Sequence, residues 1–345
     1  MVRLSIVIPA VVVDQLLEDT LVSVLTHRPK QSEVLVAFSG AYEDPYGIGD
    51  EVRLLEMPSE TSLLGLLNAA VEASRGEIVV VLAPGHEVSD GWSHVPVQRL
   101  LRDLSLGSIS PVVLRADGSD QIAVAGIIAG SRGKRVTAAA GASLATADLD
   151  QLEIDGPPLA AGFYRRRALY HVGGFDPTVG AAWADLDLAL AMRRAQYRSA
   201  CEPACCLRIA DVSRGWFEGF HEGRQAERIY WRYKTQGAQP PSIAIHSADE
   251  PAEESSLARS SAAVAPTGAL AWLGRWCGWV DMLRGRHVRE CRLATHRATE
   301  PTLAKTGGKW WRVDGAHKPD EHKRSGEASM PSELAIPPAR RAAGR

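Results

Sequence analysis

The sequence lacks most of the features by which whole classes of protein are recognised. None of its apolar runs reaches the roughly 18 uninterrupted residues that favour a membrane-spanning helix. Neither the G-x-G-x-x-G turn of dinucleotide-binding proteins nor a P-loop is present, which weakens the common nucleotide-binding folds as interpretations. The formal net charge is only -2, so overall charge gives no reason to expect a nucleic-acid partner. With 45% hydrophobic and 23% charged residues, the composition is that of an ordinary globular protein and excludes collagen, coiled coil and wholesale disorder.

Cysteine is also scarce, and its arrangement argues against a metal site. Three of the five cysteines cluster as Cys201, Cys205 and Cys206, while Cys277 and Cys291 lie far away along the chain. A structural zinc site needs more ligands at closer spacing, typically in C-x-x-C pairs, and no such pair is present. We therefore expect small buried thiols in a protein of a reducing compartment, and predict a cytoplasmic location.

Charge is distributed unevenly along the chain. Residues 1–236 contain 23 basic and 29 acidic residues, a net charge of -6, whereas residues 270–345 contain 15 basic and 8 acidic residues, a net charge of +7. Between them the sequence is rich in Pro, Ala, Ser and Glu and has little periodicity, as in a linker. The sequence thus predicts a folded domain over residues 1–236, a linker over 237–268, a Trp/Arg-rich amphipathic helix over 269–297 and a disordered basic tail over 298–345.

Short continuous apolar runs alternate with amphipathic segments in the first part of the domain. Runs without polar alternation are typical of strands buried on both faces of a parallel sheet. Ligands of such sheets bind at the carboxyl ends of the strands, so we expect the chemistry in the loops at residues 9–13, 37–44 and 83–88. The pattern predicts strands over residues 2–8, 33–38, 51–56 and 78–82, helices over 14–27 and 61–74, the second with Gly76 as its C-cap, and later helices over 182–196 and 213–236.

Six pieces of the sequence occur in the order found in one known family. They are Ser5-Ile-Val-Ile-Pro, Leu21–Leu25, Glu33-Val-Leu-Val, the segment from Asn68 to Leu82, Gly162-Phe-Tyr-Arg-Arg-Arg, and Gly173-Gly-Phe-Asp followed by Trp183-Ala-Asp-Leu-Asp-Leu. Together they resemble the glycosyltransferase family 2 domain over roughly residues 3–235. The resemblance implies an α/β fold of the GT-A type, with a mostly parallel nucleotide-sugar-binding sheet flanked by helices. It also implies an inverting hexosyltransferase that moves a sugar from a nucleotide-sugar donor to a glycan or lipid-linked envelope acceptor.

The metal-binding carboxylates of that family have no counterpart here. They follow the fourth strand and hold a divalent cation on the donor diphosphate. The matching positions are Ala83 and Gly85, and the acidic residue expected at the end of the second strand is Ala37. The usual ligands for Mg²⁺ or Mn²⁺ are therefore absent. His86 and Glu87 offer two competent ligand types beside the vacant positions, the alternative being two solvated loop residues.

The acceptor half of the family pattern is better preserved. Asp185 matches the aspartate that the resemblance assigns as the base, which takes a proton from the acceptor hydroxyl. The alternative for Asp185 is a carboxylate that caps a helix and is stabilised by the helix dipole. We expect Asp187 to cap the helix or to pair with Arg193 or Arg194.

Without a metal, cationic side chains would have to stabilise the departing diphosphate. Arg165, Arg166 and Arg167 form one candidate cluster, because arginine binds phosphate oxygens bidentately. His221 and Arg224 lie about one helical turn apart and form a second. The alternatives are arginines that are ordinary at this point of the family pattern, and a surface or domain-packing role for the second pair.

Tryptophan and arginine concentrate in the predicted helix over 269–297. Trp272, Trp276 and Trp279 lie at helical spacing within it. Three interpretations are open: an extra helix that buries its Trp stripe on the domain, a helix on a membrane surface with its arginines on anionic headgroups, or a site for a protein partner. The second predicts a protein peripheral to the inner face of the cell membrane.

Two functions follow from these observations. The first is a glycosyltransferase that binds a nucleotide-sugar and a glycan acceptor. The second is a catalytically inactive GT-A module that binds a glycan, a nucleotide or a partner transferase. The missing charge at positions 37, 83 and 85 is the feature that bears on the choice between these functions. Loss of leaving-group stabilisation slows transfer by orders of magnitude, so an active transferase requires another group that replaces it.

Overall fold

The computed structural model of the chain describes residues 2–40, 44, 47–130, 133–210, 218–235, 268–284 and 311–312. All of them belong to one compact unit that spans residues 1–313. The predicted linker lies outside the described residues except for Gly268, and the predicted tail lies outside them except for Trp311–Arg312. No helix among the described residues is long and apolar enough to cross a membrane.

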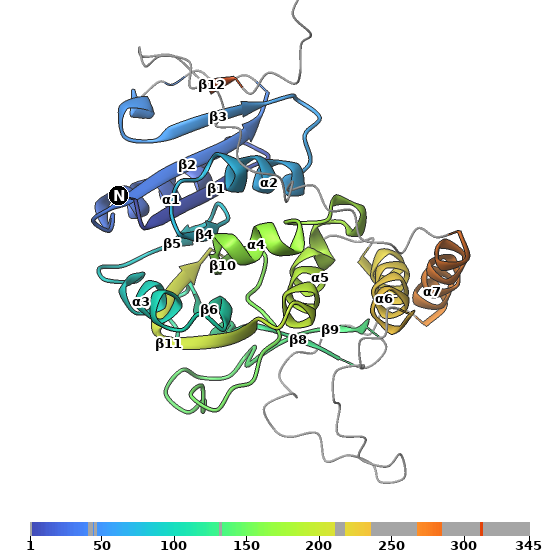
Figure 1. The fold of residues 1–345 in the computed structure, drawn as a ribbon. Coiled ribbons are helices and arrows are strands. Elements are labelled where there is room, and N and C mark those ends of the chain that lie inside the picture. The colour runs from blue at the N-terminus through green and yellow to red at the C-terminus, as the bar shows by residue number, and fades with distance from the viewer. Residues whose placement is uncertain are drawn as a thin grey trace, which may run out of the picture. The chain divides into compact units, whose positions relative to one another are not determined.

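Ten strands of the described chain form one main sheet (Figure 1). Their order is β12-β3-β2-β1-β4-β10-β6-β11-β5, with β7 paired to β6, and β8 and β9 form a separate hairpin. The strands are Leu4–Ala10 (β1), Ser32–Ser39 (β2), Arg53–Met57 (β3), Ile78–Leu82 (β4), His86–Glu87 (β5), Leu106–Arg115 (β6), Ile122–Val124 (β7), Ile127–Ala129 (β8), Arg135–Thr137 (β9), Ala161–Arg165 (β10), Arg198–Ile209 (β11) and Trp311–Arg312 (β12).

The helices follow the strands in an alternating βα order at the start of the chain. The side chain of Asp14 caps α1 by accepting from the Leu17 amide, and Ser62 caps α2 in the same way. The helices are Gln15–Thr26 (α1), Leu63–Ala73 (α2), His94–Arg102 (α3), Arg166–Val172 (α4), Ala181–Arg194 (α5), Glu218–Thr235 (α6) and Gly268–Leu283 (α7), with short 3-10 helices at Ile48–Asp50 (η1) and Pro177–Val179 (η3).

The sheet is covered on both faces, as its continuous apolar strands predict. In β1, Ile6 and Ile8 belong to the core beneath α1 and α3, whereas Val7 belongs to the core beneath α2, α4 and α5. The strands β1, β2, β3 and β4 are parallel, but β10 runs antiparallel between β4 and β6. The reversed direction of β10 decides at which end of the sheet its residues lie.

Two details differ from the expectations. Helix α2 ends at a Ser74 C-cap, so Gly76 is not the cap. Gly76 is needed instead because a Cβ there would lie 2.7 Å from the Ser5 amide nitrogen, and its own N–H donates to Ser5 Oγ at 2.9 Å. The segment predicted to be a disordered tail also contains a short strand, because β12 pairs with Leu55 and Glu56 of β3.

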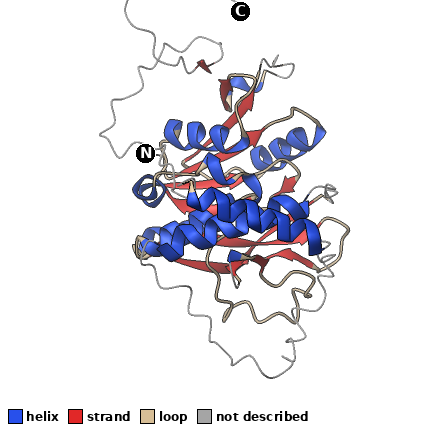
Figure 2. Ribbon diagram, turned by 90° about the vertical axis from the view of Figure 1, so that its right-hand side faces the viewer, coloured by secondary structure: helices blue, strands red, loops and turns tan. Residues whose placement is uncertain are grey.

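Helices α6 and α7 pack against each other and face the viewer in Figure 2. The contact is close because α7 places Gly278 against α6: a Cβ at Gly278 would lie 2.5 Å from the Arg224 carbonyl oxygen. Trp276 and Trp279 point away from this contact, with 55% and 42% of their surface exposed. The interpretation in which the Trp stripe is buried on the domain is therefore wrong for these two residues, and the side chain of Trp272 lies outside the described residues.

Candidate functional site

The carboxyl ends of β1, β2 and β4 lie side by side, because the three strands are parallel and in register. We call the region formed by residues 10–13, 39–40 and 83–87 the carboxyl end of the sheet. It contains the positions at which the family resemblance places donor and metal ligands. Ala37 lies just before it, wholly buried within β2. Glu87 is the only acidic residue of this region, so ligands must come from neighbouring segments.

The backbone after β4 is clamped in place. The Gly85 N–H donates to the Leu16 carbonyl at 3.1 Å and to Thr20 Oγ1 at 2.9 Å, both on α1. The Gly85 carbonyl accepts from the Ala210 N–H at 3.0 Å, at the end of β11. Gly85 has a φ of +88°, a conformation that side chains with a Cβ rarely adopt. The position where the family carries its second carboxylate is therefore built for glycine.

His86 and Glu87 do not form a metal site with a third ligand. His86 is 2% exposed, and its Nδ1 lies 2.9 Å from the Ala83 carbonyl oxygen. Burial lowers the pKa of His86 from its ordinary value, which keeps the ring neutral. Glu87 is exposed on the other face of β5, and no group of three His, Cys, Asp or Glu side chains within the described residues is placed to hold a metal. The expectation that both are solvated loop residues is wrong for His86, which is a buried strand residue.

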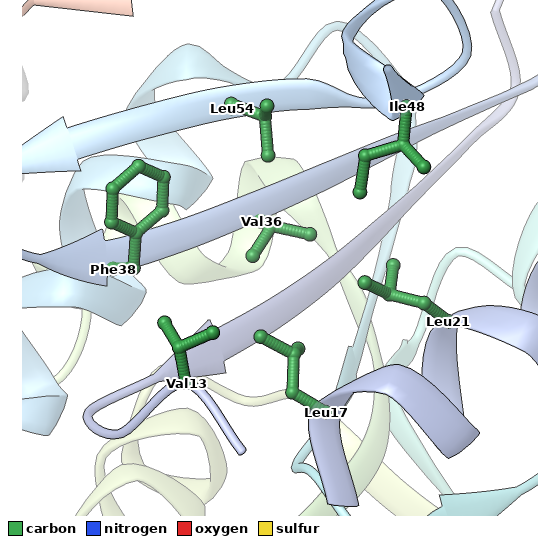
Figure 3. Close-up of a pocket in the computed structure, with 7 residues that line it drawn as sticks. All are labelled: Val13, Leu17, Leu21, Val36, Phe38, Ile48 and Leu54. Atoms are coloured by element: carbon green, nitrogen blue, oxygen red, sulfur yellow. The ribbon is translucent and has the colours of Figure 1, made fainter. Parts of the chain in front are cut away.

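A small apolar cavity lies beside the carboxyl ends of β1 and β2 (Figure 3). Its volume is about 10 Å³, roughly the space that one water molecule requires. It offers no polar side chain to orient a ligand, and a nucleoside would require the lining to open. The lining residues are Val13, Leu17, Leu21, Val36, Phe38, Ile48 and Leu54.

Asp185 lies next to the vacant carboxylate positions. The Leu159 N–H donates to its Oδ2 at 3.1 Å, and the next residue, Ala160, accepts from the Ala83 N–H at 2.7 Å. Helix α5 begins at Ala181 with Gly180 as its N-cap, so Asp185 lies in the second turn and the capping interpretation is wrong. Its side chain is 2% exposed.

The carboxylate of Asp185 is held by Arg135, a residue that no sequence pattern indicates. Arg135 Nε lies 3.0 and 3.1 Å from the two Asp185 oxygens, and its Nη2 lies 2.7 Å from Oδ2. Arg135 begins β9, in the hairpin whose other strand, β8, packs on α5 (Figure 1). The residue follows Lys134 in a short basic run within an Ala/Gly-rich stretch, and it lies 50 positions before its partner, so neither spacing nor periodicity indicates the pair.

The strand β10 carries the arginine cluster to the other end of the sheet. Because β10 is antiparallel to β4, Ala161 pairs with Leu82 and Arg165 pairs with Ile78. Arg165 thus lies where β4 begins, at the opposite end from Ala83. Arg166 and Arg167 follow in α4 at the same end.

Backbone carbonyls of the protein itself bind Arg165 and Arg166, and the Arg166 guanidinium also lies 5.8 Å from the centre of the Tyr170 ring. The Arg165 guanidinium donates to the carbonyls of Leu106 at 3.0 Å, Asp103 at 2.9 Å and Leu100. Arg166 donates to the Ser74 carbonyl at 2.7 Å. These bonds tie α3, α2 and β6 together, so the structure corrects the expectation that the cluster meets a diphosphate at the carboxyl end.

Of the second predicted pair, His221 and Arg224, the structure describes only the side chain of Arg224. The side chain of His221 lies outside the described residues. Arg224 Nε donates to Asp281 Oδ2 at 2.7 Å, and this hydrogen bond raises the pKa of Arg224 from its ordinary value. Arg224 therefore joins α6 to α7, as the domain-packing alternative predicts.

Asp187 takes part in a buried charge cluster of its own. Arg232 of α6 lies 2.6 Å from Asp187 and 3.0 Å from Asp176, and all three side chains are at most 1% exposed. The Tyr233 hydroxyl donates to Asp187 Oδ1 at 3.1 Å. The predicted partner Arg193 pairs with Asp155 instead. This cluster fixes α6 to α5 and η3 without reaching the surface.

The cysteine cluster is structural within the described chain. Cys201 and Cys205 are buried free thiols, and burial raises the pKa of Cys201 to about 12. Thiols with so high a pKa are poor nucleophiles and metal ligands at neutral pH. The expectation of buried thiols is confirmed for these two residues, and Cys291 lies outside the described residues.

Comparison with known proteins identifies the fold. No protein-family model matches the sequence, and no curated protein matches it. Among solved structures, the chain is similar to the mannosyltransferase PcManGT from Pyrobaculum calidifontis in complex with GDP-Man and Mn²⁺, at 18% identity and a TM-score of 0.50, over 69% of this chain and 66% of that one. It is also similar to GalNAc-T7 with UDP, GalNAc and Mn²⁺, at 12% identity and a TM-score of 0.52, over 69% of this chain and 52% of that one.

The chain thus has a glycosyltransferase fold of the GT-A type, and the predicted fold class is confirmed. In this chain the fold is a mixed α/β sheet in which β10 runs antiparallel between β4 and β6. The chain spans less than two thirds of the length of either neighbour. At these identities the likeness concerns the fold alone, and a fold by itself does not determine an activity.

Proposed function

We propose that the protein is a glycosyltransferase that moves a sugar from a nucleotide-sugar donor to a glycan or lipid-linked envelope acceptor, by inversion, without a resident metal. The observation that carries this proposal is the position of Asp185. The buried Asp185 carboxylate accepts a hydrogen bond from the Leu159 amide, and the next residue, Ala160, accepts one from the Ala83 amide at the carboxyl end of the sheet. A carboxylate at this place is suited to take the proton from an acceptor hydroxyl.

The proposed function implies a donor substrate that carries a diphosphate. The two neighbours in fold carry GDP-Man and UDP in their structures, each with Mn²⁺. Here Ala83 and Gly85 provide no acidic ligand for such an ion. Charge stabilisation of the departing diphosphate must therefore come from protein cations.

The test is titration calorimetry of the purified chain with UDP-, GDP- and dTDP-sugars, in EDTA and again with Mn²⁺ or Mg²⁺. Binding of one donor in EDTA supports the proposal. Release of the nucleoside diphosphate from that donor is then compared between the wild type and Asp185→Asn, which keeps the shape of the side chain and removes the base. Donor binding that requires added metal would contradict the metal-independent site, and equal release by both proteins would contradict the role of Asp185.

Two features of the carboxyl end of the sheet, its small cavity and the pairing of Asp185, favour a second function. The adjoining apolar cavity has room for about one water molecule, and Asp185 is already engaged by Arg135. A GT-A module that has lost catalysis and binds a glycan, a nucleotide or a partner transferase accounts for both. A folded chain that binds none of the sugar nucleotides, with or without metal, would favour this function over transfer.

We further propose that α7 rests on an anionic membrane surface. Its exposed side includes Trp276, Trp279 and Leu283, followed by exposed Arg284. The only acidic residue of α7, Asp281, is buried against Arg224, so no carboxylate on the helix opposes anionic lipid. Co-sedimentation with phosphatidylglycerol vesicles, but not phosphatidylcholine vesicles, is expected, and should be lost in Trp276→Ser/Trp279→Ser.

A further inference from the structure

The oxygens of Asp185 are fully occupied by hydrogen-bond donors. Oδ1 lies 2.7 Å from the Leu186 amide nitrogen and 3.0 Å from Arg135 Nε. Oδ2 lies 3.1 Å from the Leu159 amide nitrogen, 3.1 Å from Arg135 Nε and 2.7 Å from Arg135 Nη2. An ionised carboxylate offers about four lone-pair sites, and four donor groups occupy them, because the Nε–H of Arg135 is shared between both oxygens. Asp185 can therefore receive a proton from an acceptor only after one donor has left.

Arg135 is the donor that is able to leave. The amides of Leu159 and Leu186 belong to the backbone, and Leu186 is a buried residue of α5. Arg135 reaches Asp185 with a long side chain that is 25% exposed, from the end of the short hairpin β8–β9. A rotation of this side chain would free parts of both oxygens without moving any helix or strand of the main sheet.

The same end of the sheet needs a cation. A nucleoside diphosphate brings negative charge to a place where Ala83 and Gly85 hold no metal. The arginines of β10 and α4 lie at the opposite end, and Arg224 is bound to Asp281 on α7. Arg135 is the cation that the described structure pairs with Asp185, and Asp185 is linked to Ala83 through the neighbouring residues Leu159 and Ala160.

We propose that Arg135 is the diphosphate-binding residue of this site, and that the donor diphosphate draws its guanidinium from Asp185. One movement then supplies the cation that the missing metal would have provided and exposes the carboxylate that acts as base. The inference rests on the proposed transferase function and adds to it an order of events, in which the donor binds before Asp185 can act.

The groups of this site account for the proton and the electron pair that move in the transfer step. The acceptor hydroxyl oxygen forms a bond to the anomeric carbon of the donor sugar, and its proton passes to an oxygen of Asp185. The bond between the anomeric carbon and the diphosphate oxygen breaks, with its electron pair going to the diphosphate. Arg135 stabilises the charge that collects there, as a charge-assisted and bidentate pair.

The experiment measures binding of UDP, GDP and dTDP in EDTA to the wild type and to three variants. Arg135→Met is expected to weaken binding of the preferred nucleotide tenfold or more, since a charge-assisted contact is lost. Asp185→Asn is expected to bind it as tightly as the wild type or more tightly, because the guanidinium no longer has a competing anion. Arg193→Met is the matched control: it removes a neighbouring arginine that pairs with Asp155, and should leave the affinity unchanged.

The outcomes separate the two proposals. If the wild type binds a nucleotide in EDTA and Arg135→Met binds it equally well, the role of Arg135 is refuted while the transferase function stands. If the folded wild type binds none of the three with or without metal, both are refuted. If Asp185→Asn loses affinity as much as Arg135→Met, the pair is only a structural unit, and the exchange is refuted.

A second variant covers the case in which Arg135→Met does not fold, because it leaves a buried carboxylate unpaired. Arg135→Gln combined with Asp185→Asn removes both charges together. This double variant should bind the nucleotide at least tenfold more weakly than Asp185→Asn alone. Equal affinity of the two would refute the contact.

Discussion

Arg232 is expected to be among the most sensitive single positions for the stability of this chain. Its guanidinium is 1% exposed and lies between two wholly buried carboxylates, Asp176 at 3.0 Å and Asp187 at 2.6 Å. Substitution by Met keeps much of the length of the side chain and removes the charge. Asp187 then keeps the Tyr233 hydroxyl at 3.1 Å, and Asp176 keeps the amide and hydroxyl of Thr178. Both wholly buried carboxylates, however, lose the guanidinium that lies between them.

The magnitude follows from the uncompensated charge. Removing one partner of a buried ion pair costs about 3–5 kcal/mol, and here one substitution removes the partner of two carboxylates, so we expect the upper part of that range. A typical domain is stable by only about 5–15 kcal/mol. At about 2 °C per kcal/mol for a large domain, a loss of about 4–5 kcal/mol should lower the midpoint of thermal unfolding by about 8–10 °C.

The assay is thermal unfolding followed by circular dichroism, with urea unfolding as a second measure. Arg198→Met is the control of the same chemistry, because Arg198 and its partner Asp103 are 68% and 42% exposed, and exposed pairs contribute about 0–1 kcal/mol. Arg232→Met with Asp176→Asn and Asp187→Asn should recover most of the loss. A midpoint within about 2 °C of the wild type for Arg232→Met, or a triple variant no better than the single one, would refute the reasoning from buried charge.

Three further predictions concern other parts of the chain. His86 takes up a proton near pH 6.5 when unfolded but resists it when buried, so stability should be full at pH 7.5 and fall as the pH drops below about 6.5; in His86→Asn, which keeps an N–H for the Ala83 carbonyl, the urea midpoint should depend less on pH, and an unchanged slope would contradict this. In Gly278→Ala the new Cβ would lie 2.5 Å from the Arg224 carbonyl oxygen, so amide exchange in α6 and α7 should become faster, whereas protection equal to the wild type would show that the helices can separate freely. Ala83→Asp with Gly85→Asp should lower stability without creating a Mn²⁺ site, because Gly85 has a φ of +88°; a calorimetric Mn²⁺ signal from the folded variant would count against that expectation.

The order of the elements could be predicted because each one satisfies a local rule. The runs that became β1, β2 and β4 are continuous and apolar, and buried parallel strands require that. The start of α1 was also predictable, because Asp14 precedes an amphipathic stripe and its side chain caps the helix. Local rules of strand composition and helix capping are therefore sufficient to predict an α/β fold with a parallel sheet.

The direction of a strand does not follow from a local rule. Ala161–Arg165 is an apolar segment that ends in arginine, and it looks the same whether it runs with β4 or against it. The antiparallel pairing with β4 moves Arg165 to the far end of the sheet, where backbone carbonyls bind it. A prediction that placed its arginines at the carboxyl end assumed a direction that the residues themselves do not encode.

The partners of the buried charges could not be predicted for a related reason. Arg135 and Asp185 are 50 positions apart, and Asp187 and Arg232 are 45 apart. Their pairing depends on how a hairpin and a late helix pack on α5, which no spacing along the chain reveals. Asp185 itself was found because it lies within a recognisable motif, whereas Arg135 lies in a segment without periodicity.

The pairing of Arg135 with Asp185 also bears on how a site without a metal can hold a donor. Two carboxylates waiting for a metal repel a diphosphate until the ion arrives, whereas an arginine already paired with an aspartate presents no net charge. When a diphosphate takes the guanidinium, one charge-assisted contact replaces another. Because this contact involves only the diphosphate, it is the same for every nucleoside diphosphate, and the selectivity among them must come from the rest of the donor. The apolar lining beside the carboxyl end, with Val13 and Phe38 on two neighbouring segments, is where a nucleoside base would have to contribute it. Changes at Arg135 should therefore alter affinity for all nucleoside diphosphates alike, and changes in that lining should alter the preference among them.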